Sequence, residues 1–168
     1  EARDGDADLR RAHVAVQGDG IFDVRQQPLS QPAAVLGHPP DAAPAHAHGT
    51  EGIKIAVRAG VSSIEHGSFL DAEGAKMMAQ RGTFLVPTLS AGEAGEKFAK
   101  NGVLKGLRAE KALAAAAAMR SSVKIAVANH VPIAFGTDAG VIPHGTNARE
   151  FGLMVEWGGL TPMESLNA

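Results

Sequence analysis

Short apolar runs, rich in β-branched residues, alternate with amphipathic stretches along the chain after Ala45. The runs at Val61–Glu65, Thr83–Thr88 and Pro132–Gly136 are typical of buried strands. The stretches between them carry apolar residues at helical spacing, which predicts helices. Because strands that alternate with helices form parallel sheets, the pattern predicts a series of β–α units.

Capping residues give the first two helices their predicted ends. Thr50 is placed to cap a helix that Gly60 stops. Asp71 opens the next helix and Gly82 ends it. Each predicted helix therefore leads into the following strand after a short turn.

The second half of the chain predicts longer helical segments. A Gly-rich loop over Ala91–Gly102 precedes a helical region from about Leu104 to Asn129, whose alanine run has high helix propensity. A helix over Asn147–Trp157 follows. The last predicted helix, Thr161–Leu166, has the sequence of a capping box, with Thr161 as cap, Pro162 in the first position and Glu164 completing the box.

Two regions of different character divide the chain. Residues 1–44 are punctuated by proline and glycine, and we predict no regular element for most of this segment. Residues 45–168 hold four strand positions separated by helices, which fit half of a (β/α)-barrel or an open doubly wound sheet. The sequence has neither a Gly-x-Gly-x-x-Gly turn after a strand nor a P-loop, so the barrel is favoured.

Composition narrows the classes of partner. The 168 residues carry 16 Lys and Arg against 18 Asp and Glu, so no basic field exists to attract nucleic acid. No apolar run approaches the roughly 20 residues of a membrane span, and no membrane partner is expected. Cysteine is absent, so any metal must be bound by His and carboxylate ligands. These features leave the compartment unknown, with the cytoplasm favoured, because a signal sequence before Glu1 would not be seen.

Polar residues follow the predicted strands at the points where the strands end. His46 and His48 lie in AHAHG, His66 ends SIEHG, and Asp138 ends FGTDAG. Parallel α/β folds assemble their sites at the carboxyl ends of strands, so we expect these side chains to meet. Imidazoles and a carboxylate are the usual ligands of Zn²⁺. A bound metal lowers the pKa of its water, and a nearby carboxylate can pass the proton to a leaving group, which is hydrolase chemistry.

Each candidate also has a simpler structural interpretation. A single histidine at a strand end is more often a hydrogen-bonding residue than a metal ligand. His46 and His48 share a face if the strand continues, and only one of them need bind metal. Asp138 could cap the turn that follows it. Taken together, these residues favour a shared metal site over a separate structural role for each of them.

Glu65 and His144, which lie close in sequence to the candidate ligands, are assigned other roles. Glu65 precedes His66 and is expected to face the opposite way, toward the helices, in a structural role. His144 lies on the loop after the Asp138 strand. It either contacts substrate or is a surface loop residue, and the sequence does not separate the two.

At these residues the sequence resembles the metal-dependent amidohydrolase superfamily, in particular Xaa-Pro dipeptidases and imidazolonepropionase-related enzymes. The motifs that carry the resemblance lie within about residues 45–168 and are AHAHGTEGIKIAVRAGVSSIEHGSFLD, GTFLVPTLSAGE and IAFGTDAGVIPHGTNAREFGLMVEWGGLTPMESL. The resemblance implies the C-terminal half of a TIM-like (β/α)8 barrel, strands five to eight, with parallel strands. It also implies one or two divalent metals, usually zinc, and hydrolysis of amide C–N bonds in dipeptides, Xaa-Pro dipeptides above all, or in cyclic amides.

The resemblance assigns roles by matching position. His46 would be the metal ligand from the fifth strand and His66 the ligand from the sixth. Asp138 would be both a ligand and the general base from the eighth strand. His48 and His144 match positions at which substrate contacts are expected.

The first 44 residues depart from the family pattern. A His-x-His pair of the first strand is absent upstream, and the stretch over residues 12–22, which resembles the fourth-strand region, contains no Lys. We therefore expect a truncated barrel that is inactive by itself. The alternative is a non-catalytic α/β fragment with vestigial ligands that self-associates through exposed strand edges, and homo-oligomerisation stays open.

Overall fold

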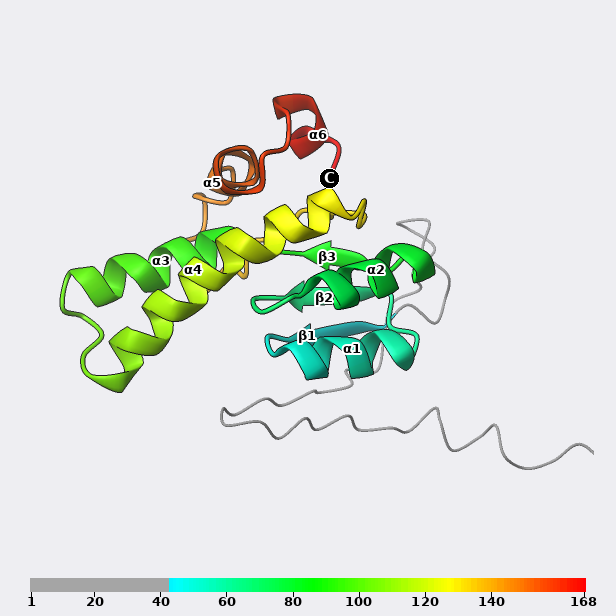
Figure 1. Ribbon diagram of the computed structural model, residues 1–168. Helices are drawn as coiled ribbons and strands as arrows, with labels where there is room; N and C mark the ends of the chain where they lie inside the picture. Colours follow the sequence, from blue (N-terminus) through cyan, green and yellow to red (C-terminus); the bar gives the residue numbers. More distant parts are fainter. Residues whose placement is uncertain (1–42) are drawn as a thin grey trace, which may run out of the picture.

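Three short parallel strands form the sheet of the computed structural model, which describes residues 43–168 (Figure 1). Their order is β1 (Pro44–Ala47), β2 (Ser63–His66) and β3 (Phe84–Val86). Helix α1 (Thr50–Arg58) connects the first pair and α2 (Ala72–Arg81) connects the second. The predicted parallel β–α units are confirmed here, while most of the predicted N-terminal segment, residues 1–42, lies outside the described residues.

The segment Pro132–Gly136 extends the sheet beside β3 without becoming a regular strand. A single parallel bridge pairs Leu85 with Ile133. The Leu85 amide donates to the Pro132 carbonyl at 2.9 Å, and the Ala134 amide donates to the Leu85 carbonyl at 2.9 Å. The predicted position is therefore confirmed, but the prediction of a full strand was wrong. Proline has no N–H with which to lengthen a ladder.

The core lies between the sheet and the helices α1 and α2. Ala45, Ile64 and Leu85 are register neighbours on successive strands, and each is at most 4% exposed. They share this cluster with Ile53 and Val57 of α1. Because alternate strand residues face opposite sides, the neighbours of these apolar residues point to the other face of the sheet.

The ends of α1 and α2 follow the sequence signals in part. The Asp71 carboxylate accepts the Gly74 N–H at 2.7 Å, and Gly82 ends α2 in the left-handed conformation, as predicted. The prediction for Thr50 was wrong, because Gly49 is the N-cap residue and the Thr50 hydroxyl donates to the Phe69 carbonyl at 2.7 Å. That bond ties the start of α1 to the loop after β2.

Helix α3 (Leu89–Lys100) occupies the stretch that was predicted to be a Gly-rich loop. The glycines lie where α3 packs against α4 (Leu107–Ala128): a Cβ on Gly92 would lie 2.7 Å from the Met119 sulfur, and one on Gly95 would meet Ala112 at 3.7 Å. Close helix packing thus outweighs the low helix propensity of glycine. The predicted long helix is confirmed as α4, and the two helices form a hairpin that extends beyond the sheet (Figure 1).

The chain ends in three short helices. The predicted helix Asn147–Trp157 is divided into α5 (Arg149–Leu153) and a π-helical turn, η3 (Met154–Gly158). Helix α6 (Pro162–Leu166) has the predicted capping box, with reciprocal bonds between Thr161 and Glu164. Within residues 43–168, none of the helices combines the length and the apolar character that crossing a membrane requires.

Candidate metal centre

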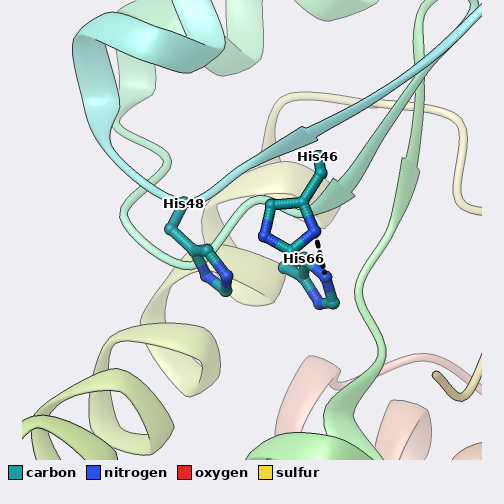
Figure 2. A group of neighbouring side chains, drawn as sticks. All are labelled: His46, His48 and His66. Atoms are coloured by element: carbon teal, nitrogen blue, oxygen red, sulfur yellow. Dashed lines mark hydrogen bonds between the residues drawn. The ribbon is translucent and has the colours of Figure 1, made fainter. Parts of the chain in front are cut away.

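Three histidines come together at the carboxyl ends of β1 and β2 (Figure 2). His46 faces away from the core because Ala45 and Ala47 on either side of it are buried there. His48 follows the end of β1, and His66 is the last residue of β2. Each ring offers one nitrogen, and these three atoms lie within 4.8 Å of one another.

The distance between the two proposed metal ligands suits coordination of one ion. His66 Nε2 lies 3.1 Å from His46 Nδ1, a hydrogen-bonding distance in the structure. Two imidazole nitrogens on a tetrahedral zinc, each at about 2.0–2.1 Å, would lie roughly 3.3 Å apart. The His48 ring stacks on the His66 ring, with centroids 4.6 Å apart and planes 7° from parallel. The donor set therefore fits a borderline divalent cation.

Buried hydroxyl groups hold two of the rings. His66 Nδ1 lies 2.6 Å from Thr88 Oγ1, and His48 Nδ1 lies 2.7 Å from Ser68 Oγ. Ser68 and Thr88 are 0% and 3% exposed. Hydrogen bonds to the second nitrogen fix the orientation and tautomer of a ligating imidazole. Sequence reasoning missed both hydroxyl residues, although Thr88 ends a predicted strand and Ser68 lies shortly after another.

Left-handed backbone conformations recur where the strands end. His66 has φ 70°, Thr88 has φ 47° and Asp138 has φ 53°. Such conformations are uncommon outside glycine, and for a β-branched threonine they cost on the order of 1–3 kcal/mol. Strain of this kind persists where the surroundings enforce it, and it concentrates at functional sites.

Gly67 allows the chain to turn sharply after His66. It has φ 55°, and a Cβ there would lie 2.5 Å from Leu85 Cδ1. Its N–H donates to the Ala47 carbonyl at 3.0 Å, and its own carbonyl accepts from Ser122 Oγ at 2.5 Å. Because Ser122 belongs to α4, this hydrogen bond joins the long helix to the backbone of the residue that follows His66.

The surroundings favour the neutral form of the imidazoles. Burial, together with the neighbouring rings, lowers the pKa of His48 to about 4, and burial and His46 lower the pKa of His66 to about 4. Desolvation also lowers the pKa of His46, against the opposing charge of Asp138. Neutral imidazole is the form that ligates a metal. The lowered pKa values therefore favour the protonation state of the rings that can bind a cation.

The two remaining predicted residues, Asp138 and His144, lie outside the histidine cluster. Asp138 is exposed and lies outside the group of three, but its charge acts to raise the pKa of both His46 and His48. The structure therefore brings Asp138 near enough to influence the rings. His144 is exposed on the following loop and lies outside the cluster.

The predicted orientation of Glu65, toward the helices, was wrong. Its neighbour Ile64 packs into the core beside α1 and α2, so Glu65 faces the opposite side, as the register partner of His46. The left-handed conformation of His66 breaks the alternation from which the prediction was made. Burial raises the pKa of Glu65, and its carboxylate accepts a 2.7 Å hydrogen bond from Ser63.

A histidine cluster at the carboxyl ends of parallel strands is the arrangement expected of a metal-dependent α/β-barrel protein. Residues 42–168 match the model of the Amidohydrolase family. The chain belongs to this family, as the resemblance of its motifs predicted.

Individual relatives agree with the family assignment. The chain is 39% identical over 127 residues to ochratoxinase from Aspergillus niger, covering 74% of this chain and 25% of that protein. A solved Xaa-Pro dipeptidase with bound methionine in the active site gives a TM-score of 0.69 and 43% identity, over 74% of this chain and 30% of that one. A solved prolidase complexed with N-methylphosphonate-L-proline gives a TM-score of 0.63 and 32% identity, over 74% of this chain and 30% of that one.

The chain thus spans about a quarter of the curated relative and under a third of these solved chains. Its parallel strands and connecting helices superpose on part of each solved structure. The prediction of a partial amidohydrolase barrel is confirmed by this match.

Proposed function

We propose that this chain is part of a metal-dependent hydrolase of amide C–N bonds, with Xaa-Pro dipeptides as the preferred substrate class. The observation that carries the proposal is the convergence of three imidazole nitrogens within 4.8 Å in an amidohydrolase-family chain. The relatives named as a dipeptidase, a prolidase and ochratoxinase support the choice of an amide substrate.

His46 and His66 are proposed to hold the metal, which we take to be zinc, with Asp138 as a further ligand. A divalent cation in this position supplies Lewis acidity, which polarises a carbonyl and makes water a better nucleophile. His48 is proposed to contact substrate, and its place in the cluster makes a ligand role the alternative. Thr88 and Ser68 would keep the rings in their binding orientation.

The side chains of this chain would handle the protons of the reaction. Asp138 accepts a proton from the attacking water and delivers it to the leaving amide nitrogen. A C–O bond forms, the C–N bond breaks, and the products are a carboxylic acid and an amine. His144, which is exposed on the loop after Asp138, is proposed to contact the substrate.

We expect this chain to be inactive when it is isolated. The one His-x-His pair in the sequence is His46–His48, so the second pair that the resemblance leads us to expect is missing. Release of proline from an Xaa-Pro dipeptide by this chain with added zinc would contradict this expectation.

Titration of the full chain with zinc, measured by calorimetry, tests the site. We expect the wild-type chain to bind zinc and the His46→Ala, His66→Ala double variant to lose binding. His130→Asn is the matched control, because His130 is exposed, lies outside the cluster and has a left-handed backbone that asparagine tolerates. Undiminished binding in the double variant would overturn the ligand assignment, and no binding by the wild type would favour the vestigial alternative.

A His48→Ala variant separates the two roles of His48. A ligand role predicts weaker zinc binding, whereas a substrate contact predicts zinc binding equal to that of the wild type. Circular dichroism of each variant establishes that the fold is retained.

A further inference from the structure

Glu150 is a fully buried carboxylate that the proposed chemistry does not use. It lies on α5 and is 0% exposed. Its two oxygens each accept a backbone N–H at 2.7 Å, one from Leu89 and one from Ser90. These are the first two residues of α3, so a residue some 60 positions away caps this helix.

The residue that would ordinarily cap α3 is occupied elsewhere. Thr88 is the N-cap residue, and threonine in this position commonly accepts a helix N–H with its hydroxyl. Thr88 makes no such cap bond. Its hydroxyl instead lies 2.6 Å from His66 Nδ1. The side chain of Thr88 therefore bonds to His66, and the carboxylate of Glu150 accepts the N–H groups at the start of the helix.

The remote cap is a costly way to end a helix. Burying a carboxylate carries a desolvation penalty, which raises the pKa of Glu150 above its usual range despite the two backbone donors. Thr88 is also held at φ 47°, which is unfavourable for a β-branched residue. The buried carboxylate and the left-handed threonine are both explained if this arrangement serves to place the Thr88 hydroxyl beside the His66 ring.

We propose that Glu150 is a positioning residue of the metal centre: by capping α3 it leaves Thr88 Oγ1 to fix the orientation and tautomer of His66. The inference concerns His66 in the role given to it by the proposed function, and it rests on that function. With Nδ1 engaged by Thr88, the ring turns Nε2 toward His46, at 3.1 Å. When Thr88 Oγ1 accepts from the Nδ1–H group of His66, Nε2 carries the lone pair that a metal ligand needs.

The nitrogen chemical shifts of the His66 ring test this without metal. They are measured by ¹⁵N NMR on the full chain at about pH 8, which is above the ordinary histidine pKa of about 6.5, so that the ring is neutral. We expect Glu150→Ala to move the His66 tautomer toward the mixture of an unconstrained imidazole, and Glu150→Gln, which keeps one acceptor oxygen, to have a smaller effect. If Glu150→Ala does not fold, Glu150→Gln carries the test.

Arg149→Gln is the matched control. Arg149 precedes Glu150 and also joins α5 to α3, through a 2.9 Å bond to Glu93, but it does not reach the helix end. We expect this variant to leave the His66 signals in place. Signals unchanged in folded Glu150→Ala and Glu150→Gln would overturn the proposal, as would an equal movement in Arg149→Gln, which would indicate general loosening.

A double variant tests the proposed route through Thr88. Thr88→Val removes the hydroxyl and should shift the His66 signals by itself. Adding Glu150→Gln should then shift them no further, whereas additive shifts would show that Glu150 acts independently of Thr88 and would overturn the mechanism.

Zinc affinity provides the second readout. Loss of a group that hydrogen-bonds to a ligand typically weakens metal binding by about 10- to 100-fold. We expect Thr88→Val to fall in this range, Glu150→Gln to lie at its lower end, about 10-fold, and Arg149→Gln to leave the affinity unchanged. If the wild-type chain binds no zinc but the ring signals respond as described, the proposed function fails and the positioning role stands. If zinc binds and Glu150→Gln changes neither affinity nor signals, the positioning role fails alone.

Discussion

Replacing Gly67 by alanine should destabilise the fold more than replacing another left-handed glycine. Gly67 has φ 55°, and a Cβ there would lie 2.5 Å from Cδ1 of Leu85, whose side chain is fully buried. Alanine in the left-handed region costs about 1–2 kcal/mol, and overpacking a filled core adds about 1–3 kcal/mol. We therefore expect Gly67→Ala to lower the free energy of unfolding by about 2–5 kcal/mol.

Gly60→Ala is the matched comparison, because Gly60 has φ 86° but open space around its Cβ position. It should cost only the backbone term of about 1–2 kcal/mol. Urea unfolding followed by circular dichroism measures both values. In a Leu85→Val background, which lacks the obstructing Cδ1 atom, the added cost of Gly67→Ala should fall to that of Gly60→Ala. Equal costs for the two alanine variants in the wild-type background would refute the steric reasoning.

Further predictions concern other supports of the site and the fold. Ser122→Ala removes the 2.5 Å side-chain donor of the Gly67 carbonyl, which keeps a 3.0 Å bond from the Leu70 N–H. The free energy of unfolding in urea should therefore fall by about 0.5–1.5 kcal/mol, whereas the exposed neighbour Ser121→Ala should change little; similar losses in both would argue against the role of this bond. Thr161→Ala removes the capping box of α6 and should cost about 0.5–2 kcal/mol in the same assay, and a value near zero would count against the cap. The pKa values of His48 and His66 are lowered to about 4 in the folded chain, against about 6.5 for an unperturbed histidine. The unfolded chain therefore binds more protons in this window, and the stability of the metal-free protein should fall as pH drops from about 6.5 toward 4, with these two groups contributing no more than about 2.7 kcal/mol per pH unit. A His48→Gln, His66→Gln double variant should lose that contribution, and an unchanged acid profile would contradict the assigned pKa shifts.

The histidine cluster was accessible to sequence reasoning because one rule of topology places it. Parallel strands present their carboxyl ends at the same edge of a sheet. His46 and His66 each lie at such an end, so the 3.1 Å approach of their rings follows from two strand assignments. The small errors in strand limits did not matter, because the polar residue and the glycine after it mark where each strand stops.

Helix α3 was missed because its stabilising contacts are not local. Gly92 and Gly95 lower the helix propensity of the stretch, and the sequence alone does not show that they fit against Met119 and Ala112 of α4. An ion pair between Glu93 and Lys97, four residues apart, adds support that an argument from helix propensity does not include.

Glu65 and Thr88 show a second limit of sequence reasoning. Strand alternation predicts which face a side chain takes only while the backbone stays extended. His66 adopts φ 70°, so the backbone is no longer extended at the residue from which the orientation of Glu65 was inferred. In the same way, the bond from Glu150 to the start of α3 spans about 60 residues and has no local signature.

The left-handed residues at the strand ends have a consequence for laboratory evolution of this protein. Glycine at position 138, where the side chain is exposed, would relax the backbone, and selection for heat resistance alone would therefore reward a substitution that deletes this carboxylate. At positions 66 and 88 the side chains are buried, so glycine would leave a cavity that opposes the gain. Heat resistance and the proposed metal chemistry therefore conflict at position 138. A screen that demands both should leave this residue untouched and gather its stabilising changes on the outer helices.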